Sequence, residues 1–218
     1  MEQNSLFDAF NLYVTWGNDL VDADGNHFTG TQIPAFICPS DTSPTPGLNP
    51  IYTSDETKLN GSSNYVGNAG IEGWNGRRMD AGHRDKWGPM GMNTYVTFGE
   101  ITDGSSNTIL YGERVTAPET GPAPSNNLGA IWVGSHRFQN NGNLTNMSGR
   151  WSNMGRTGGL NYVVNGHYRG RSLASSGHPT GATVALCDGS AQFLSDDLSN
   201  TTLRDMSAMA DGRVAGAF

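Results

Sequence analysis

Acidic and histidine side chains around two apolar segments are the first candidates for chemistry. Glu100 precedes and Glu113 ends the segment ITDGSSNTILYGE, and a glycosidase uses two carboxylates about 5–10 Å apart as acid and base. His178 and Asp188 flank the second segment, and an oriented imidazole serves acid–base catalysis. All four residues also have a structural explanation as strand-end carboxylates, turn formers or partners of a loop carbonyl, and this explanation is favoured. The chain is therefore expected to be non-catalytic, or else a hydrolase.

The metal-ligand patterns are incomplete. Asp22, Asp24 and Asn26 alternate around Gly25, as oxygen ligands do in calcium loops, but no glutamate closes an EF-hand. A polar turn is the favoured reading, and calcium is the only cofactor that the sequence indicates. The histidines form no HxxxH or HxH pair and the chain has no CxxC, so a zinc site would require distant residues to converge.

Two cysteines and several tryptophans remain open to two interpretations. Cys38 and Cys187 form either one disulfide or two buried thiols, and their spacing does not decide between these. Trp74, Trp87 and Trp151 stand in polar sequence, as in surfaces that stack on sugar rings or dock a partner. The favoured alternative is that they cover a thin core. The sequence has no P-loop, GxGxxG or GxSxG motif.

Composition indicates one loop-rich domain. The 218 residues include 30 Gly and 10 Pro, with 15% charged and 35% hydrophobic residues, which favours short segments joined by many turns. The net charge of -7 argues against nucleic-acid binding, which needs clustered cations. The sequence contains no apolar run long enough to span a membrane.

The predicted fold class is α+β, with an antiparallel sheet, long loops and a short helix near each end. Leu6 to Val14 have helical spacing, which predicts a helix over 5–14. TVALC and SAQFLS flank Asp188-Gly189, which predicts a hairpin with a type I′ turn. Leu203 and Met206 predict a final helix capped by Thr201 or Thr202. Further strands are expected in 94–114, 129–136 and 160–165, with Cys38 where a strand meets a loop. Long loops are expected at about 39–64, 72–93 and 137–158.

The residues around the predicted hairpin resemble a known family. His178, nine intervening residues and Asp188-Gly189 look like the H-X9-DG motif of prepilin-type proteins of unknown function. FICPSD, SNYVGNAG, ITDGSSNTILYGE and TLRDMSAMADGRV resemble further blocks of that family, in the same order. The resemblance covers about residues 1–218, and it implies a single pseudopilin-like head domain.

The resemblance carries expectations about function and location. Related proteins are similar to type II secretion pseudopilins, whose cleaved apolar helix anchors them; such a helix is expected before Met1 and is missing here. A head without it is expected to expose an apolar groove or to have it covered by another chain. We expect a surface or secretion-apparatus protein acting in assembly or ligand binding, at the cell surface, in the periplasm or outside the cell. Expected partners are its own copies, other pilin-like subunits or polysaccharide, with membrane contact only through the missing helix. The alternatives are a carbohydrate-binding module, or a hydrolase of glycans or esters that uses loop carboxylates and His178.

Overall fold

Short strands dominate the described part of the chain. The structure, a computed structural model, describes residues 30–41, 48–49, 60–71, 85–90, 95–115, 130–132, 136–140, 143–147, 151–153, 164–165 and 174–215. The strands are β1 Leu48–Asn49, β2 Asn60–Ser63, β3 Tyr65–Gly70, β4 Ile109–Glu113, β5 Ala130–Ile131, β6 His136–Asn140, β7 Asn143–Met147, β8 Trp151–Asn153, β9 Gly181–Leu186 and β10 Ala191–Ser195. Within these described ranges, the helices are two 3₁₀ turns, η2 Pro34–Phe36 and η5 Phe98–Glu100, and the α-helix α2 Asn200–Ser207.

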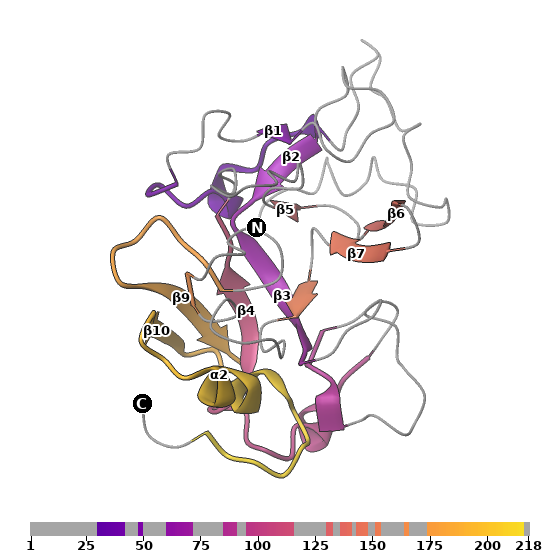
Figure 1. Cartoon of the computed structure of the whole chain (residues 1–218), viewed down its shortest axis with the longest axis vertical. Helices are drawn as coiled ribbons and strands as arrows, with labels where there is room; N and C mark the ends of the chain where they lie inside the picture. The colour runs from indigo at the N-terminus through magenta and orange to yellow at the C-terminus, as the bar shows by residue number, and fades with distance from the viewer. Residues whose placement is uncertain are drawn as a thin grey trace.

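Five of these strands form the main sheet, in the order β10-β9-β4-β3-β8. The first four are antiparallel neighbours, and β8 runs parallel to β3. Among the described residues, β1, β2 and β5 form a second sheet beside the upper end of β3, and β6 pairs with β7 (Figure 1). The prediction of a sheet-rich α+β fold with an antiparallel sheet is confirmed to this extent.

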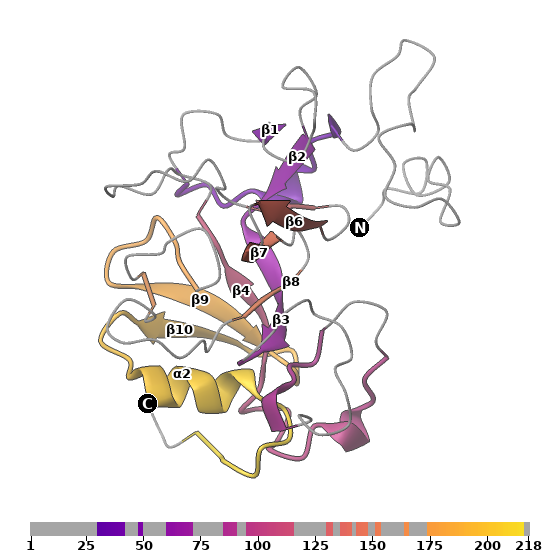
Figure 2. The ribbon, with the colours of Figure 1, turned by 45° about the vertical axis from the view of Figure 1, so that its right-hand side comes forward.

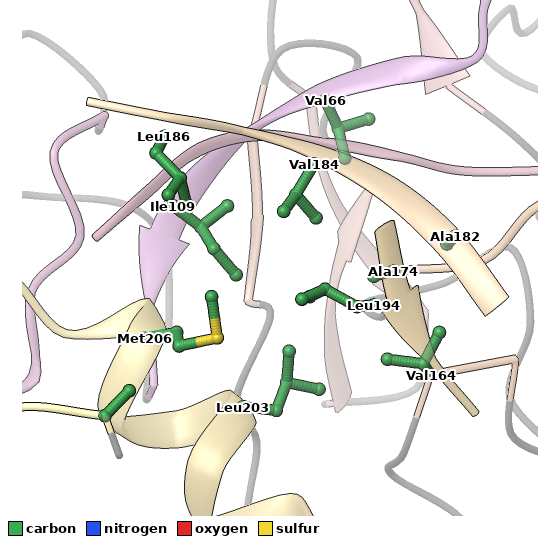
Figure 3. Close-up of a cluster of buried hydrophobic side chains, with 11 residues drawn as sticks. Val66, Ile109, Val164, Ala174, Ala182, Val184, Leu186, Leu194, Leu203 and Met206 are labelled. Atoms are coloured by element: carbon green, nitrogen blue, oxygen red, sulfur yellow. The ribbon is translucent and has the colours of Figure 1, made fainter. Parts of the chain in front are cut away.

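The core lies between the main sheet and α2. Val66, Ile109, Val184 and Leu194 project from four neighbouring strands toward the helix, and all are at most 1% exposed (Figure 3). Figure 2 shows α2 lying along the β9–β10 side of the sheet. Burying apolar side chains of this size contributes about 1.5–3 kcal/mol each, so this layer provides much of the stability of the domain.

The helix α2 forms where the sequence predicted one, but it is capped by a different residue. Leu203 and Met206 are three residues apart and are fully buried against the sheet, as an amphipathic helix requires. The Ser199 hydroxyl accepts a hydrogen bond from the Thr202 amide at 3.0 Å and is the N-cap. The prediction of Thr201 or Thr202 as the cap is therefore wrong.

The predicted hairpin is confirmed, but its turn type is wrong. Strands β9 and β10 pair from Ala185↔Ala191 to Gly181↔Ser195. The Gly189 amide bonds the Leu186 carbonyl at 3.0 Å, and the Leu186 amide bonds the Ser190 carbonyl at 2.8 Å. Only Gly189 has a positive φ in this turn, at 89°. The three residues 187–189 thus make a tight turn with a glycine bulge, whereas a type I′ turn needs positive φ at both central residues.

Strands also occupy parts of the segments predicted as loops. Segment 39–64 contains β1 and β2, and segment 137–158 contains β7, β8 and most of β6. Local composition concealed them because they are short and each contains Asn, which is depleted in strands. The segment before Cys38, where a strand was expected, forms the 3₁₀ turn η2 and then a bend, and a turn follows Cys38. The helix predicted over 5–14 lies outside the described residues, as does most of the strand predicted over 160–165.

Candidate functional site

Three side chains that can do chemistry meet at the upper end of the main sheet. The Nε2 atom of His178 lies 3.3 Å from Oε1 of Glu113 and 3.5 Å from Sγ of Cys38. One ligand atom of each residue lies within 4.8 Å of the other two. Glu113 and Cys38 are buried, whereas the His178 side chain is 33% exposed. Figure 1 shows the end of β4, where Glu113 stands, between β3 and β9. We call Cys38, Glu113 and His178 the upper cluster.

Asn64 positions Cys38. Asn64 forms the bend between β2 and β3 and is 2% exposed. Its Oδ1 accepts a hydrogen bond from the Cys38 amide at 2.8 Å, while its Nδ2 donates to the Arg114 carbonyl at 2.9 Å and to the Asp41 carboxylate. The Asn64 amide also donates to the Phe36 carbonyl at 2.8 Å. The buried side-chain amide of Asn64 therefore joins the Cys38 loop to the end of β4.

Glu113 is held by the neighbouring strand. Its Oε2 accepts a hydrogen bond from the Thr183 amide at 2.6 Å, and its carbonyl accepts one from the Ser175 amide at 2.9 Å. In the β3–β4 register Glu113 faces Tyr65. With Oε2 bonded to β9, Oε1 is directed toward His178.

The His178 loop is shaped by its own polar residues. The Ser176 hydroxyl donates to the Gly181 carbonyl at 2.6 Å and accepts from the His178 amide at 3.0 Å. Gly177 allows this loop to approach the Cys38 loop, since a Cβ atom there would lie 2.2 Å from the Ser40 carbonyl oxygen. Only glycine fits at this approach, so Gly177 brings His178 to the thiol.

Tyr65 lies within electrostatic range of the upper cluster. Burial raises the pKa of the Tyr65 phenol, and the charges that Cys38 and Glu113 can carry raise this pKa further. Tyr65 therefore stays protonated at neutral pH. A protonated phenol is a hydrogen-bond donor.

The upper cluster does not have the geometry of a nucleophile–base–acid relay. In such a relay one imidazole nitrogen faces the nucleophile and the other faces the carboxylate. Here Sγ of Cys38 and Oε1 of Glu113 both approach Nε2 of His178. The arrangement suits three donors that converge on one point better than it suits proton transfer along a line.

Two of the four predicted catalytic residues lie outside this cluster. The Asp188 carboxylate accepts hydrogen bonds from the amide and hydroxyl of Ser190 at 2.9 and 2.7 Å, which lowers its pKa. His178 precedes β9 and Asp188 follows it, so the strand places them on the order of 15–20 Å apart. Glu100 accepts hydrogen bonds from the amide and hydroxyl of Thr97 in the capping box of η5. Asp188 thus has the turn-forming role favoured from sequence, whereas Glu100 caps a 3₁₀ turn and does not end a strand.

The structure describes some of the remaining predicted site residues. Cys38 and Cys187 are both buried free thiols, and burial followed by the charge of Asp188 raises the pKa of Cys187 to about 11. Trp87 forms a bridge with Gly70, and its carbonyl accepts a hydrogen bond from the Met209 amide at 2.9 Å. The proposed calcium ligands Asp22, Asp24 and Asn26 lie outside the described residues, as do Trp74 and the side chain of Trp151.

Sequence reasoning considered Cys38 for a disulfide or as a buried thiol, not for a site, and missed Asn64. One signal could have revealed the site: antiparallel pairing of 109–113 with 181–186 places the end of the first strand beside the start of the second. Such a pairing brings Glu113 next to the His178 loop. The contribution of Cys38 had no comparable signal, because it depends on the bend at Asn64.

Comparison with known proteins identifies the family. No curated protein and no solved structure matches the chain. No helix among the described residues is long and apolar enough to span a bilayer. Residues 1–201 match the model of the family SBP_bac_10, which is described as a protein of unknown function (DUF1559). This match covers most of the 218 residues, and the chain therefore belongs to that family.

Proposed function

We propose that the chain is a non-catalytic, pilin-like head that acts in assembly at the cell surface, in the periplasm or outside the cell. Its partner is a second copy of itself, or another pilin-like subunit in a mixed assembly. The partner docks on the face of the main sheet that points away from α2, which we call the open face.

The exposed aromatic residues of the open face are the observation that carries this proposal. Tyr111 pairs with Ala185, and Phe193 pairs with Thr183. Paired residues of an antiparallel sheet share a face, and these pairs alternate with the buried residues that face α2, such as Val184. Phe193 is 52% exposed and Tyr111 is 39% exposed. Two large aromatic side chains from neighbouring parts of one sheet face are typical anchors of a protein interface.

Self-association tests the proposal. Light scattering over a concentration series is expected to show reversible association, because burying two partly exposed aromatic rings per chain favours the complex. Phe193→Ser and Tyr111→Ser are expected to shift the midpoint of self-association to higher protein concentration. Tyr95→Ser is the matched control, since Tyr95 is 90% exposed and lies before η5, outside the sheet. A chain that stays monomeric at every concentration, or that responds equally to all three variants, argues against the open face.

The contact between Glu113 and His178 favours a second candidate, hydrolysis of a glycan or an ester. The Glu113 carboxylate lies 3.3 Å from the His178 imidazole, and positioned carboxylate and imidazole groups are the usual general acids and bases. Turnover of glycan or ester substrates that is lost in both Glu113→Gln and His178→Asn would support this candidate. Equal rates in wild type and both variants would remove it.

A further inference from the structure

The upper cluster has the donor set of a transition-metal site. Cys38, Glu113 and His178 offer a sulfur, an oxygen and a nitrogen atom from three distant parts of the chain, and the three atoms lie within 4.8 Å of one another. Thiolate and imidazole ligands favour zinc and similar ions over calcium or magnesium, which prefer oxygen. We propose that these three residues bind one divalent zinc-like ion.

The two distances from Nε2 fit one ion bound to all three donors, and the third, between Sγ and Oε1, is at most 4.8 Å. Tetrahedral bonds of about 2.0–2.3 Å to nitrogen, oxygen and sulfur imply N···O and N···S separations of about 3.3 and 3.5 Å. The structure has 3.3 Å between Nε2 and Oε1 and 3.5 Å between Nε2 and Sγ. One protonated Nε2 cannot make two good hydrogen bonds at once, whereas an ion between the three atoms satisfies all of them.

Charge and proton balance support the same ion. Binding forms one metal–sulfur, one metal–oxygen and one metal–nitrogen bond, and the Cys38 thiol releases its proton to solvent. The thiolate and the Glu113 carboxylate then carry two negative charges, which a divalent cation neutralises. His178 binds through the lone pair of Nε2 and keeps its proton on Nδ1. Because Cys38 and Glu113 are only 5% and 3% exposed, this neutralisation removes a large desolvation cost.

Outer hydrogen bonds already hold each ligand in place. The Thr183 amide binds the Glu113 carboxylate, the Asn64 amide oxygen binds the Cys38 amide, and the Ser176 hydroxyl binds the His178 amide. Such supporting bonds are a regular feature of metal sites. His178 is one-third exposed, so a water molecule can complete a four-coordinate site from the solvent side.

Cobalt(II) titration of the 218-residue chain tests this site. With chelator-treated, reduced protein, one equivalent of Co²⁺ is expected to give a thiolate-to-cobalt charge-transfer band and visible bands of tetrahedral cobalt. One equivalent of Zn²⁺ is expected to abolish these bands. Cys38→Ser should remove the charge-transfer band, and His178→Asn should weaken Co²⁺ binding on the order of 100-fold or more, since even outer-shell losses cost 10–100-fold.

Cys187→Ser is the matched control, because Cys187 is also a buried thiol but lies outside the upper cluster. It is expected to keep the full band. Circular dichroism of each variant checks folding, and His178→Asn changes a partly exposed side chain and should leave the fold intact. The inference is overturned if wild type gives no band, if Cys38→Ser keeps it, or if Cys187→Ser alone loses it. Light scattering is independent of these bands, so failure of the assembly proposal and failure of the metal site are distinguishable.

Discussion

Asn64 is the residue whose removal should most clearly separate the Cys38 loop from the sheet. In Asn64→Ala the Cys38 amide and the Arg114 carbonyl both lose their bonds to the Asn64 side chain, and Cys38 and Arg114 are both buried. Each unsatisfied buried group costs about 1–3 kcal/mol. Two such groups predict that the free energy of unfolding falls by about 2–6 kcal/mol. Asp41 is only half-buried, and water can replace its lost bond at little cost.

That loss is large for a domain whose total stability is about 5–15 kcal/mol. It corresponds to a drop in melting temperature on the order of 10 °C for a chain of this length. Urea unfolding followed by circular dichroism measures it directly as a lower midpoint at constant slope. Co²⁺ affinity should fall in the same variant, because Cys38 is then held less firmly.

Asn107→Ala is the control for this experiment. The side-chain amide of Asn107 donates one hydrogen bond of 3.2 Å to the Asp103 carbonyl four residues earlier. The free energy of unfolding is therefore expected to fall by less than about 1 kcal/mol. If Asn64→Ala costs no more than Asn107→Ala, the Asn64 side chain does not join the two segments. The reasoning about how Cys38 is positioned would then be refuted.

Three further outcomes follow from other parts of the structure. Gly189→Ala should destabilise by about 1 kcal/mol because its φ is +89°, whereas Gly99→Ala, with open space and no positive φ, should change urea unfolding little. Burial, followed by repulsion from Asp103, raises the pKa of Asp211, so Asp211→Asn should stabilise the fold at neutral pH. That gain should vanish as the pH falls through the raised pKa, where wild-type Asp211 is also uncharged. Cys187, with a pKa of about 11, is a thiolate in about one of ten thousand molecules at neutral pH, so mass spectrometry should find it unmodified by iodoacetamide until the chain is unfolded.

The sequence predicts the elements whose pattern is local. The β9–β10 hairpin and α2 were found because alternation, an Asp-Gly step and helical spacing each lie within a few residues. The turn type was missed because Gly189 alone, and not Asp188, takes a positive φ. Strand β2 was missed because its residues have low strand propensity, and it forms through pairing with β1 and with β5, which is far away in the sequence.

The candidate site was predicted in pieces and not as a whole. Glu113 and His178 were singled out for acid–base chemistry and Cys38 for a disulfide, but their meeting depends on the order of strands in the sheet. Antiparallel pairing of β4 with β9 brings Glu113 to Thr183. The bend at Asn64 then brings Cys38 to the same point. Neither the strand order nor this bend can be deduced from spacing along the chain.

Buried polar side chains near the two ends of the β3–β4 pair differ in their hydrogen-bond partners. At the lower end, the Asp103 carboxylate accepts hydrogen bonds from the Asp211 and Gly212 amides at 2.7 and 3.0 Å. Both of its oxygens are thereby engaged with backbone donors, so a structural role accounts for this buried charge. At the upper end, Oε1 of Glu113 and Sγ of Cys38 share a single imidazole nitrogen.

A purely structural role would not require three different donor types to converge on one point. Replacing a buried polar cluster with apolar side chains of similar volume is often neutral or stabilising. The fold therefore gains little stability from keeping a thiol, a carboxylate and a one-third-exposed imidazole together at the upper end of the sheet. The proposed ion accounts for this combination of donors, which hydrogen bonding at Asp103 does not require, and we therefore expect metal binding at the upper cluster.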